Sequence, residues 1–381
     1  MDMTKIDLAW ANMIAGIEAQ ESYLREAPFV LYEQLKRLAI SERPSRVYLT
    51  GCGDSWYCGM ATRFAFEEWA GIATEPSQAM EFSRYLVHHA PTDALVVAIS
   101  NSGRVSRTIE AVKRADQRGI ETLAGTADMA SGIARAARFA VDLGYAERRF
   151  APGTSSYLAS LVLLYCLAVR LGELGGRLGP AAARAKLEEI SELAQAMRET
   201  IAAQRPLLEE LGARVGRTDQ VMFLGAGPNY GTASFSMAKL IEAGRHNAVG
   251  QELEEWAHEQ YFVCGPGSYV FVLAPQGAGV DRAREQLWAV RQTGAFAIAV
   301  CDAGDGETAA LADLTLPVFG RSSETLSPLC YCVAGELFGY SFAASKDLKM
   351  LGFDDEHRKQ VNFRQIFESR IVPLGEAKLS E

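Results

Sequence analysis

The stretch VYLTGCGDS at residues 47–55 indicates the fold class, together with the stretch LVVAISNSG at residues 95–103. Each stretch is a short apolar run that ends in Gly, Ser, Asp or Asn. Such a run is typical of a strand that is buried on both faces and leaves its sheet into a loop. Two similar runs follow, beginning near Glu121 and Phe139. We therefore predict four strands in the first half of the chain.

The second half repeats this spacing. The first four runs start at intervals of 48, 26 and 18 residues, and the runs near Val221, Val270, Phe296 and Leu314 start at intervals of 49, 26 and 18. Helical patterns, such as residues 107–118, lie between the runs. Alternating strands and helices predict right-handed parallel βαβ units. We interpret the chain as α/β, with two tandem doubly wound parallel sheets and helices on both faces of each.

The flanking and connecting segments read as helical. A stretch from about residue 180 to 212 is rich in Ala, Glu, Leu and Arg, which are strong helix formers. The sequence therefore predicts five segments: an N-terminal helical region (1–44), a first domain (45–178), a connecting helix (179–213), a second domain (214–345) and a C-terminal tail (346–381).

Composition excludes several classes of function. The net charge of −9 argues against a general nucleic-acid surface. Neither GxGxxG nor GxxxxGK[ST] follows a predicted strand, which disfavours dinucleotides and ATP. The seven cysteines lack paired CxxC spacing, so we expect buried thiols, no metal and no cofactor. No uninterrupted apolar run reaches the roughly 18 residues of a membrane span, and we expect a cytoplasmic protein.

Two loops of the first domain are equipped to hold an anion. In a doubly wound sheet, ligands bind beyond the carboxyl ends of the strands, where loops deliver backbone N–H groups. Residues 51–55 offer glycines and a hydroxyl, and residues 100–106 offer three hydroxyls and an amide. The equivalent loop of the second domain, residues 274–279, has no hydroxyl, so we expect only the first domain to bind the anion. The bland alternative is that these are ordinary turn and N-cap residues.

Three motifs in this region carry a family resemblance. The runs CGDSWYCGMATRFAFEEWAG (52–71), AMEF (79–82) and AISNSG (98–103) resemble the first SIS (sugar isomerase) domain of glucosamine-6-phosphate synthase and of related sugar isomerases and deglycases. The resemblance covers about residues 45–345 and implies a flavodoxin-like fold in each half. It assigns sugar-phosphate contacts to Ser55, Ser100, Asn101, Ser102 and Ser155.

One departure from the family lies in the second loop. The family has Thr two residues after the SxSG glycine, where this chain has Val105. Ser106 is the candidate replacement, and an anion other than a plain phosphate is the alternative.

The second domain supplies candidates for an acid and a base. Lys239 and Glu242 are three residues apart on a predicted helix over residues 232–243 that is ended by Gly244, so they share a face. The family has KLxE followed sixteen residues later by a histidine in ExxH, and here that histidine is His258, preceded by Glu255. Taken singly, the pair could be a solvated ion pair and His258 a structural histidine.

The resemblance and the chemistry together suggest roles. Moving a carbonyl between C1 and C2 needs a base, for which we choose Glu242, and sugar-ring opening suits the imidazole of His258. Lys239 could stabilise the enediolate or enediolamine, and Glu255 falls on a substrate position of the family. The resemblance also implies that the histidine segment reaches a neighbouring subunit's pocket, which makes a homodimer the expected catalytic unit.

Three functions remain open at this point. The first is an aldose–ketose isomerase or amino-sugar deaminase that acts on a sugar phosphate. The second is a deglycase that splits a fructosamine phosphate through the same enolamine chemistry, and the third is a non-catalytic sugar-phosphate sensor. Family members often have Gly-Pro after the histidine, where this chain has Glu259-Gln260. Only 46 residues precede the first predicted strand, so we expect no glutaminase domain.

Overall fold

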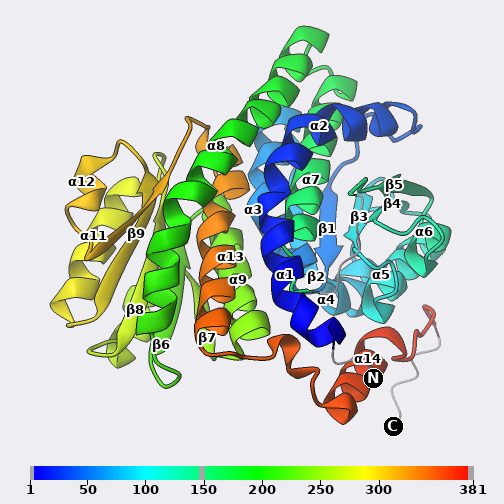
Figure 1. The fold of residues 1–381 in the computed structure, drawn as a ribbon. Coiled ribbons are helices and arrows are strands. Elements are labelled where there is room, and N and C mark those ends of the chain that lie inside the picture. The colour runs from blue at the N-terminus through cyan, green and yellow to red at the C-terminus, as the bar shows by residue number, and fades with distance from the viewer. Residues whose placement is uncertain (1–3, 146–150, 376–381) are drawn as a thin grey trace. The chain divides into compact units, whose positions relative to one another are not determined.

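The computed structural model describes residues 4–145 and 151–375 of the chain (Figure 1). These residues form two compact units, each built around one sheet. The first-sheet unit comprises Glu26–Ala146, Ser156–Ser191 and Asp355–Glu381. The second-sheet unit comprises Met1–Arg25, Glu147–Ser155 and Glu192–Asp354. The C-terminal segment is therefore part of the unit that holds the first sheet.

The first sheet has five parallel strands in the order β2-β1-β3-β4-β5. This is the flavodoxin-like order, so the predicted fold class is confirmed. β1 and β3 are buried along their whole length, because a helix layer covers each face of the sheet. The strands are β1 Val47–Gly51, β2 Thr74–Gln78, β3 Leu95–Ile99, β4 Glu121–Thr126 and β5 Phe139–Asp142.

The second sheet repeats this topology. Its order, β10-β9-β8-β6-β7, is the first order read from the other edge, and all its pairs are parallel. The repeat predicted from strand spacing is thus confirmed. The strands are β6 Gln220–Gly225, β7 Ala248–Glu252, β8 Ser268–Ala274, β9 Phe296–Asp302 and β10 Leu314–Val318.

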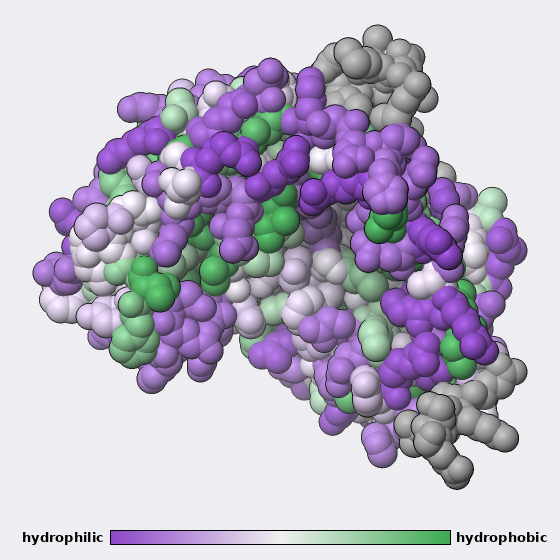
Figure 2. All heavy atoms as spheres, turned by 90° about the horizontal axis from the view of Figure 1, so that it is seen from below, coloured by the Kyte–Doolittle hydropathy of each residue, from purple (hydrophilic) through white to green (hydrophobic). Residues whose placement is uncertain are grey.

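Helices of the first-sheet unit include one that is apolar throughout. α7 is long and apolar enough to cross a membrane by length and composition, but most of it is buried inside the fold. It therefore packs as a core helix. On the face of the molecule shown in Figure 2, hydrophobic side chains form small groups among polar ones. The helices are α2 Gln20–Lys36, α3 Asp54–Ala65, α4 Ala79–Arg84, α5 Ser106–Gln117, α6 Gly132–Ala136, α7 Ser155–Leu174 and α14 Glu356–Phe367, with short turns η1 Phe66–Ala70 and η2 Leu86–His88.

In the second-sheet unit, α9 and α13 pack against each other along most of their length. Small residues allow this approach, since a Cβ on Gly339 would lie 2.9 Å from the carbonyl oxygen of Lys239. The connecting helix α8 runs from Pro180 to Arg214, close to its predicted bounds. The other elements are α1 Thr4–Glu18, α9 Pro228–Gly244, α10 Glu255–His258, η3 Gln260–Val263, α11 Val280–Gln292, α12 Gly306–Ala309, η4 Glu324–Leu326, α13 Pro328–Ser345 and η5 Met350–Gly352.

The ends of α9 differ from the prediction. The helix begins at Pro228, four residues before the predicted start, because proline suits the first helical position. Its left-handed terminal residue is Arg245, with φ 49°, and Gly244 is the last helical residue. Gly244 is needed for packing, since a Cβ there would lie 2.7 Å from Cδ1 of Phe342.

Candidate functional site

The first sheet has its topological switch point between β1 and β3. From β1 the chain moves to one side to form β2, and β3 then lies on the other side of β1. The loops that leave β1 and β3 therefore flank the crevice where ligands of doubly wound folds bind. Each loop leads into a helix, at Asp54 for α3 and at Ser106 for α5, so two helix N-termini open at this edge.

The loop after β3 is held by its own backbone. The N–H of Ser100 donates to the carbonyl of Gly125 at 3.0 Å, and the N–H of Gly103 donates to the carbonyl of Ser100 at 2.9 Å. Gly103 has φ 63°, and a Cβ on it would lie 2.0 Å from Oγ of Ser131. Only glycine fits at this position.

Three hydroxyls at the carboxyl ends of adjacent strands are buried and have no partner among the described residues. Ser100 is 2% exposed, and its Oγ has no hydrogen-bond partner among the residues that the structure describes. The same holds for Thr50 in β1 and Ser77 in β2. These two residues are register partners on neighbouring parallel strands. A buried hydroxyl without a partner costs free energy, so a water molecule or another polar group is expected beside each of them.

Thr50 and Ser77 were not predicted as site residues. Thr50 lies inside the VYLTG run, where a threonine is an ordinary strand residue. Ser77 lies in β2, a strand that the sequence did not reveal.

Four of the predicted anion-binding residues share one loop. Asn101 holds the loop through its carbonyl, which accepts from the N–H of Ala127 at 3.1 Å. The hydroxyl of Ser102 accepts from the N–H of Arg104 at 3.3 Å, and Ser106 is buried at the first position of α5. Together with Ser100, these residues border the switch point.

Ser55 and Ser155 lie outside the loop formed by residues 100–106. Ser55 is in the first turn of α3, across the switch point from the Ser100 loop. Ser155 begins α7, and its hydroxyl donates to the carbonyl of Gly16 at 2.8 Å. Ser155 is grouped with the second-sheet unit, whereas the anion contacts predicted at residues 55 and 100–106 belong to the first-sheet unit.

In the second-sheet unit, Lys239 and Glu242 form an ion pair. Nζ of Lys239 lies 2.6 Å from Oε2 of Glu242. Lys239 is fully buried and also lies over the ring of Phe235, whereas the side chain of Glu242 is 34% exposed. The ammonium is therefore not a solvated surface group, and the carboxylate is open to a ligand on one side.

His258 ends the short helix α10 and is well exposed. Its side chain is 66% exposed, and Nε2 lies 3.4 Å from a carboxylate oxygen of Glu254. The carboxylate of Glu252 accepts from the backbone N–H groups of Glu254 and Glu255 and so fixes the start of this helix. Glu255 is exposed on the same helix.

The sheet separates Glu242 from His258 within one unit. α9 begins beside the carboxyl end of β6 and runs back, and Glu242 lies fourteen residues after Pro228, about 21 Å along the helix axis. β7 then runs parallel to β6, and His258 follows its carboxyl end. Glu242 thus lies near the amino ends of the strands of the second sheet, and His258 lies near their carboxyl ends.

No described residues form a cluster suited to a metal ion. Within residues 4–145 and 151–375, no group of three or more His, Cys, Asp or Glu side chains could hold one.

The family model of the SIS domain matches residues 40–170, which cover the whole first sheet and most of α7. Residues 40–170 form a SIS domain. Among curated proteins, the chain is 28% identical over 317 residues to a glutamine–fructose-6-phosphate aminotransferase (isomerizing) of Methanosarcina acetivorans, covering 82% of this chain and 51% of that protein. A protein of the same name from Symbiobacterium thermophilum is 28% identical over 303 residues, with 79% and 49% covered. The chain thus spans about half the length of these relatives.

Solved structures extend the likeness to both units. The C-terminal domain of glucosamine-fructose-6-phosphate aminotransferase from Francisella tularensis superposes with a TM-score of 0.77, covering 89% of this chain and 97% of that one at 17% identity. A glucosamine-6-phosphate deaminase from Thermotoga maritima gives a TM-score of 0.72, covering 88% and 95% at 19% identity. The fold of these solved structures therefore accounts for nearly the whole chain.

Proposed function

We propose that the protein is a sugar-phosphate isomerase or amino-sugar-phosphate deaminase that acts at C1 and C2 through an enediol or enediolamine. The observation that carries the proposal is the group of buried hydroxyls at the switch point of the SIS domain that have no partner within residues 4–145 and 151–375. These groups are donors and acceptors in need of a polar ligand. A phosphate, with three terminal oxygens, satisfies several of them at once.

The anion end of the substrate binds at the Ser100 loop. Backbone N–H groups at the starts of α3 and α5 and the hydroxyls of Ser55, Ser100, Ser102 and Ser106 surround the phosphate, with the amide of Asn101 beside them. Because the chain is acidic overall, this local field of dipoles and hydroxyls has to supply the attraction.

The carbon end requires proton transfer. Glu242 removes the proton from one carbon and returns it to the other, and His258 opens the sugar ring. Lys239, 2.6 Å from Glu242, stabilises the negative charge of the enediolate. The pair is suited to this work because the buried ammonium keeps the half-exposed carboxylate in one position.

A homodimer completes the site. Since Glu242 and His258 lie near opposite ends of the strands of one sheet, a second copy supplies the histidine to each pocket. A surface next to His258 supports this arrangement, because large apolar side chains are exposed on η3 and α11: Tyr261, Phe262, Val263 and Trp288. Contiguous exposed apolar groups of this kind mark contact surfaces. The proposed location of the enzyme is the cytoplasm.

Solvent-deuterium uptake tests the proposed reaction. Hexose phosphates, amino-sugar phosphates and fructosamine phosphates are incubated in D₂O, and label at C1 or C2 is followed by NMR. We expect uptake with an aldose, ketose or amino-sugar phosphate, and we expect Glu242→Gln to lose it by about 100-fold or more while ligand binding persists. Uptake with fructosamine phosphates alone would assign a deglycase.

The matched control is Glu210→Gln, which makes the same chemical change at an exposed position of α8. It should exchange at the wild-type rate. Binding without uptake by any sugar phosphate would assign a sensor, and normal uptake by Glu242→Gln would remove Glu242 from the mechanism.

A further inference from the structure

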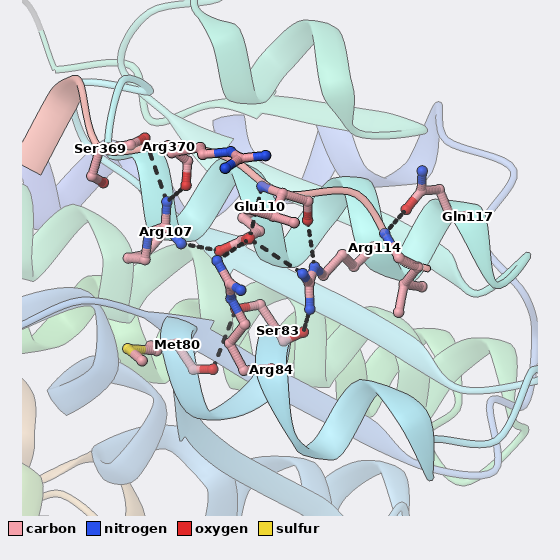
Figure 3. Close-up of polar contacts among 11 residues, drawn as sticks. Met80, Ser83, Arg84, Arg107, Glu110, Arg114, Gln117, Ser369 and Arg370 are labelled. Carbon is pink, nitrogen blue, oxygen red and sulfur yellow. Dashed lines mark hydrogen bonds and ion pairs between the residues drawn. The ribbon is translucent and has the colours of Figure 1, made fainter. Parts of the chain in front are cut away.

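The C-terminal segment of the chain is clamped onto α5, the helix that follows the anion loop. At the centre of the clamp is Glu110, which is fully buried (Figure 3). Its carboxylate pairs with Arg84 at 2.7 Å, with Arg107, and with Arg114 at 3.6 Å. A buried carboxylate that pairs with three guanidinium groups is a rigid anchor, because both of its oxygens are engaged and its charge is fully compensated.

The clamp holds residues 369–374 by their main chain. Arg107 donates to the carbonyls of Ser369 and Arg370, and Nε of Arg114 donates to the carbonyl of Val372 at 2.8 Å. The N–H of Val372 donates to Glu110 at 3.0 Å, and the N–H of Leu374 donates to Gln117 at 2.9 Å. Residues 107, 110, 114 and 117 share one face of α5, so the helix grips the segment along its length.

This docking places α14 against the anion loop itself. Cζ of Arg104, in the Ser100 loop, lies 4.9 Å from the ring centroid of Phe367, the last residue of α14. Arg104 is exposed, and it forms no ion pair with any carboxylate in the described part of the chain. A guanidinium stacked on an aromatic ring keeps its in-plane N–H groups free for a carboxylate or phosphate.

We propose that the C-terminal segment is a strap that presents Arg104 to the phosphate of the substrate. The inference rests on the proposed function, and it adds a charged specificity residue to the hydroxyl loop. Arg104 is next to Val105, which brings no hydroxyl, and the guanidinium adds a charge-assisted contact to those of the serine hydroxyls. Phe367 is a positioning residue that acts through Arg104.

Calorimetric titration of the full chain with fructose 6-phosphate and with inorganic phosphate tests this role. Arg104→Gln should weaken binding of both by about tenfold or more, because one charge-assisted hydrogen bond is lost. Phe367→Leu should weaken it by a smaller factor, and Phe367→Tyr, which keeps an aromatic face, should restore wild-type affinity. The control Arg358→Gln removes the same charge from an exposed position of α14 and should leave affinity within twofold.

Two readouts separate this inference from the proposed function. Unchanged affinity in Arg104→Gln, or tighter binding in Phe367→Leu, would overturn the strap even if Glu242-dependent deuterium uptake is present. Loss of affinity in Arg104→Gln supports the strap even if no sugar phosphate takes up deuterium. A wild-type protein that binds neither probe would overturn both.

Discussion

Glu242 and His258 lie near opposite ends of the strands of the second sheet, although only sixteen residues separate them in the chain. The reason is the crossover: α9 carries Glu242 away from the carboxyl edge, and β7 brings the chain back before α10 begins. One copy of this unit therefore does not bring the proposed base and the proposed imidazole together.

Mixing two inactive variants tests whether subunits share sites. In a dimer of Glu242→Gln with His258→Ala, one pocket has lost both groups and the other has retained both. We expect each variant alone to be inactive, and a refolded equimolar mixture to regain about a quarter of wild-type deuterium uptake, since half the dimers are mixed and each has one intact site. A mixture as inactive as its components would show that the two residues do not work across subunits.

Ser100→Ala should separate binding from stability. The hydroxyl of Ser100 is buried and unpaired among the described residues, so its removal should leave the free energy of unfolding unchanged or raise it by up to about 1 kcal/mol. The affinity for fructose 6-phosphate should fall by about tenfold.

The control for this pair of measurements is Ser160→Ala. Ser160 is equally buried, but its hydroxyl donates to the carbonyl of Ser156 at 2.7 Å. We expect it to lose about 1 kcal/mol of stability with affinity unchanged. Wild-type affinity in Ser100→Ala would exclude that hydroxyl from the site.

Glu110→Gln should release the C-terminal segment. The change leaves three guanidinium groups beside a neutral amide in a buried position, which costs about 3–5 kcal/mol when one partner of a buried pair is removed. Urea unfolding measures the loss, and hydrogen exchange at the amides of Val372 and Leu374 should accelerate. Glu188→Gln, in an exposed pair with Arg184, should cost less than about 1 kcal/mol and leave that exchange unchanged.

His246 should make stability depend on pH. Burial lowers the pKa of its imidazole below 6.5, and the ring hydrogen-bonds the carbonyl of Asp219 at 2.8 Å. The unfolded chain therefore binds a proton more readily than the folded one as the pH falls below about 6.5. Stability should be greatest above that pH and should fall by at most about 1.4 kcal/mol per pH unit below it.

Unfolding curves between pH 8 and 5.5 test this slope. His246→Asn should flatten it, while His357→Asn, at an exposed position, should keep the wild-type slope. An equal slope in all three proteins would assign the pH dependence to other groups.

Most of the fold could be predicted from strand spacing. Eight strands are visible as apolar runs in the sequence, and the helices between them follow from βαβ logic. The two missed strands, β2 and β7, lie at sheet edges and read TEPSQ and AVGQE. An edge position alone is not the reason, because the edge strands β5 and β10 keep the apolar runs FAVD and LTLPV. In β2 and β7, polar residues and Pro76 replace the apolar side chains, which an edge strand tolerates.

The candidate site could be predicted only in its local parts. The Ser100 loop and the Lys239–Glu242 pair are visible as motifs because each is contiguous or lies on one helix. Thr50 and Ser77 were missed, since their burial without partners depends on neighbouring strands. The link from Arg104 to Phe367 spans more than 260 residues, and no local pattern reports such a contact.

The grip on residues 369–374 carries an evolutionary consequence. Its hydrogen bonds reach carbonyls and N–H groups that every non-proline residue owns, so the segment can drift in sequence and stay docked. We therefore expect the sequence constraint to fall on the α5 side chains that hold the segment. In a set of homologues, conservation of positions 107, 110 and 114 would identify the proteins in which the segment is docked, even where the sequence of the segment varies.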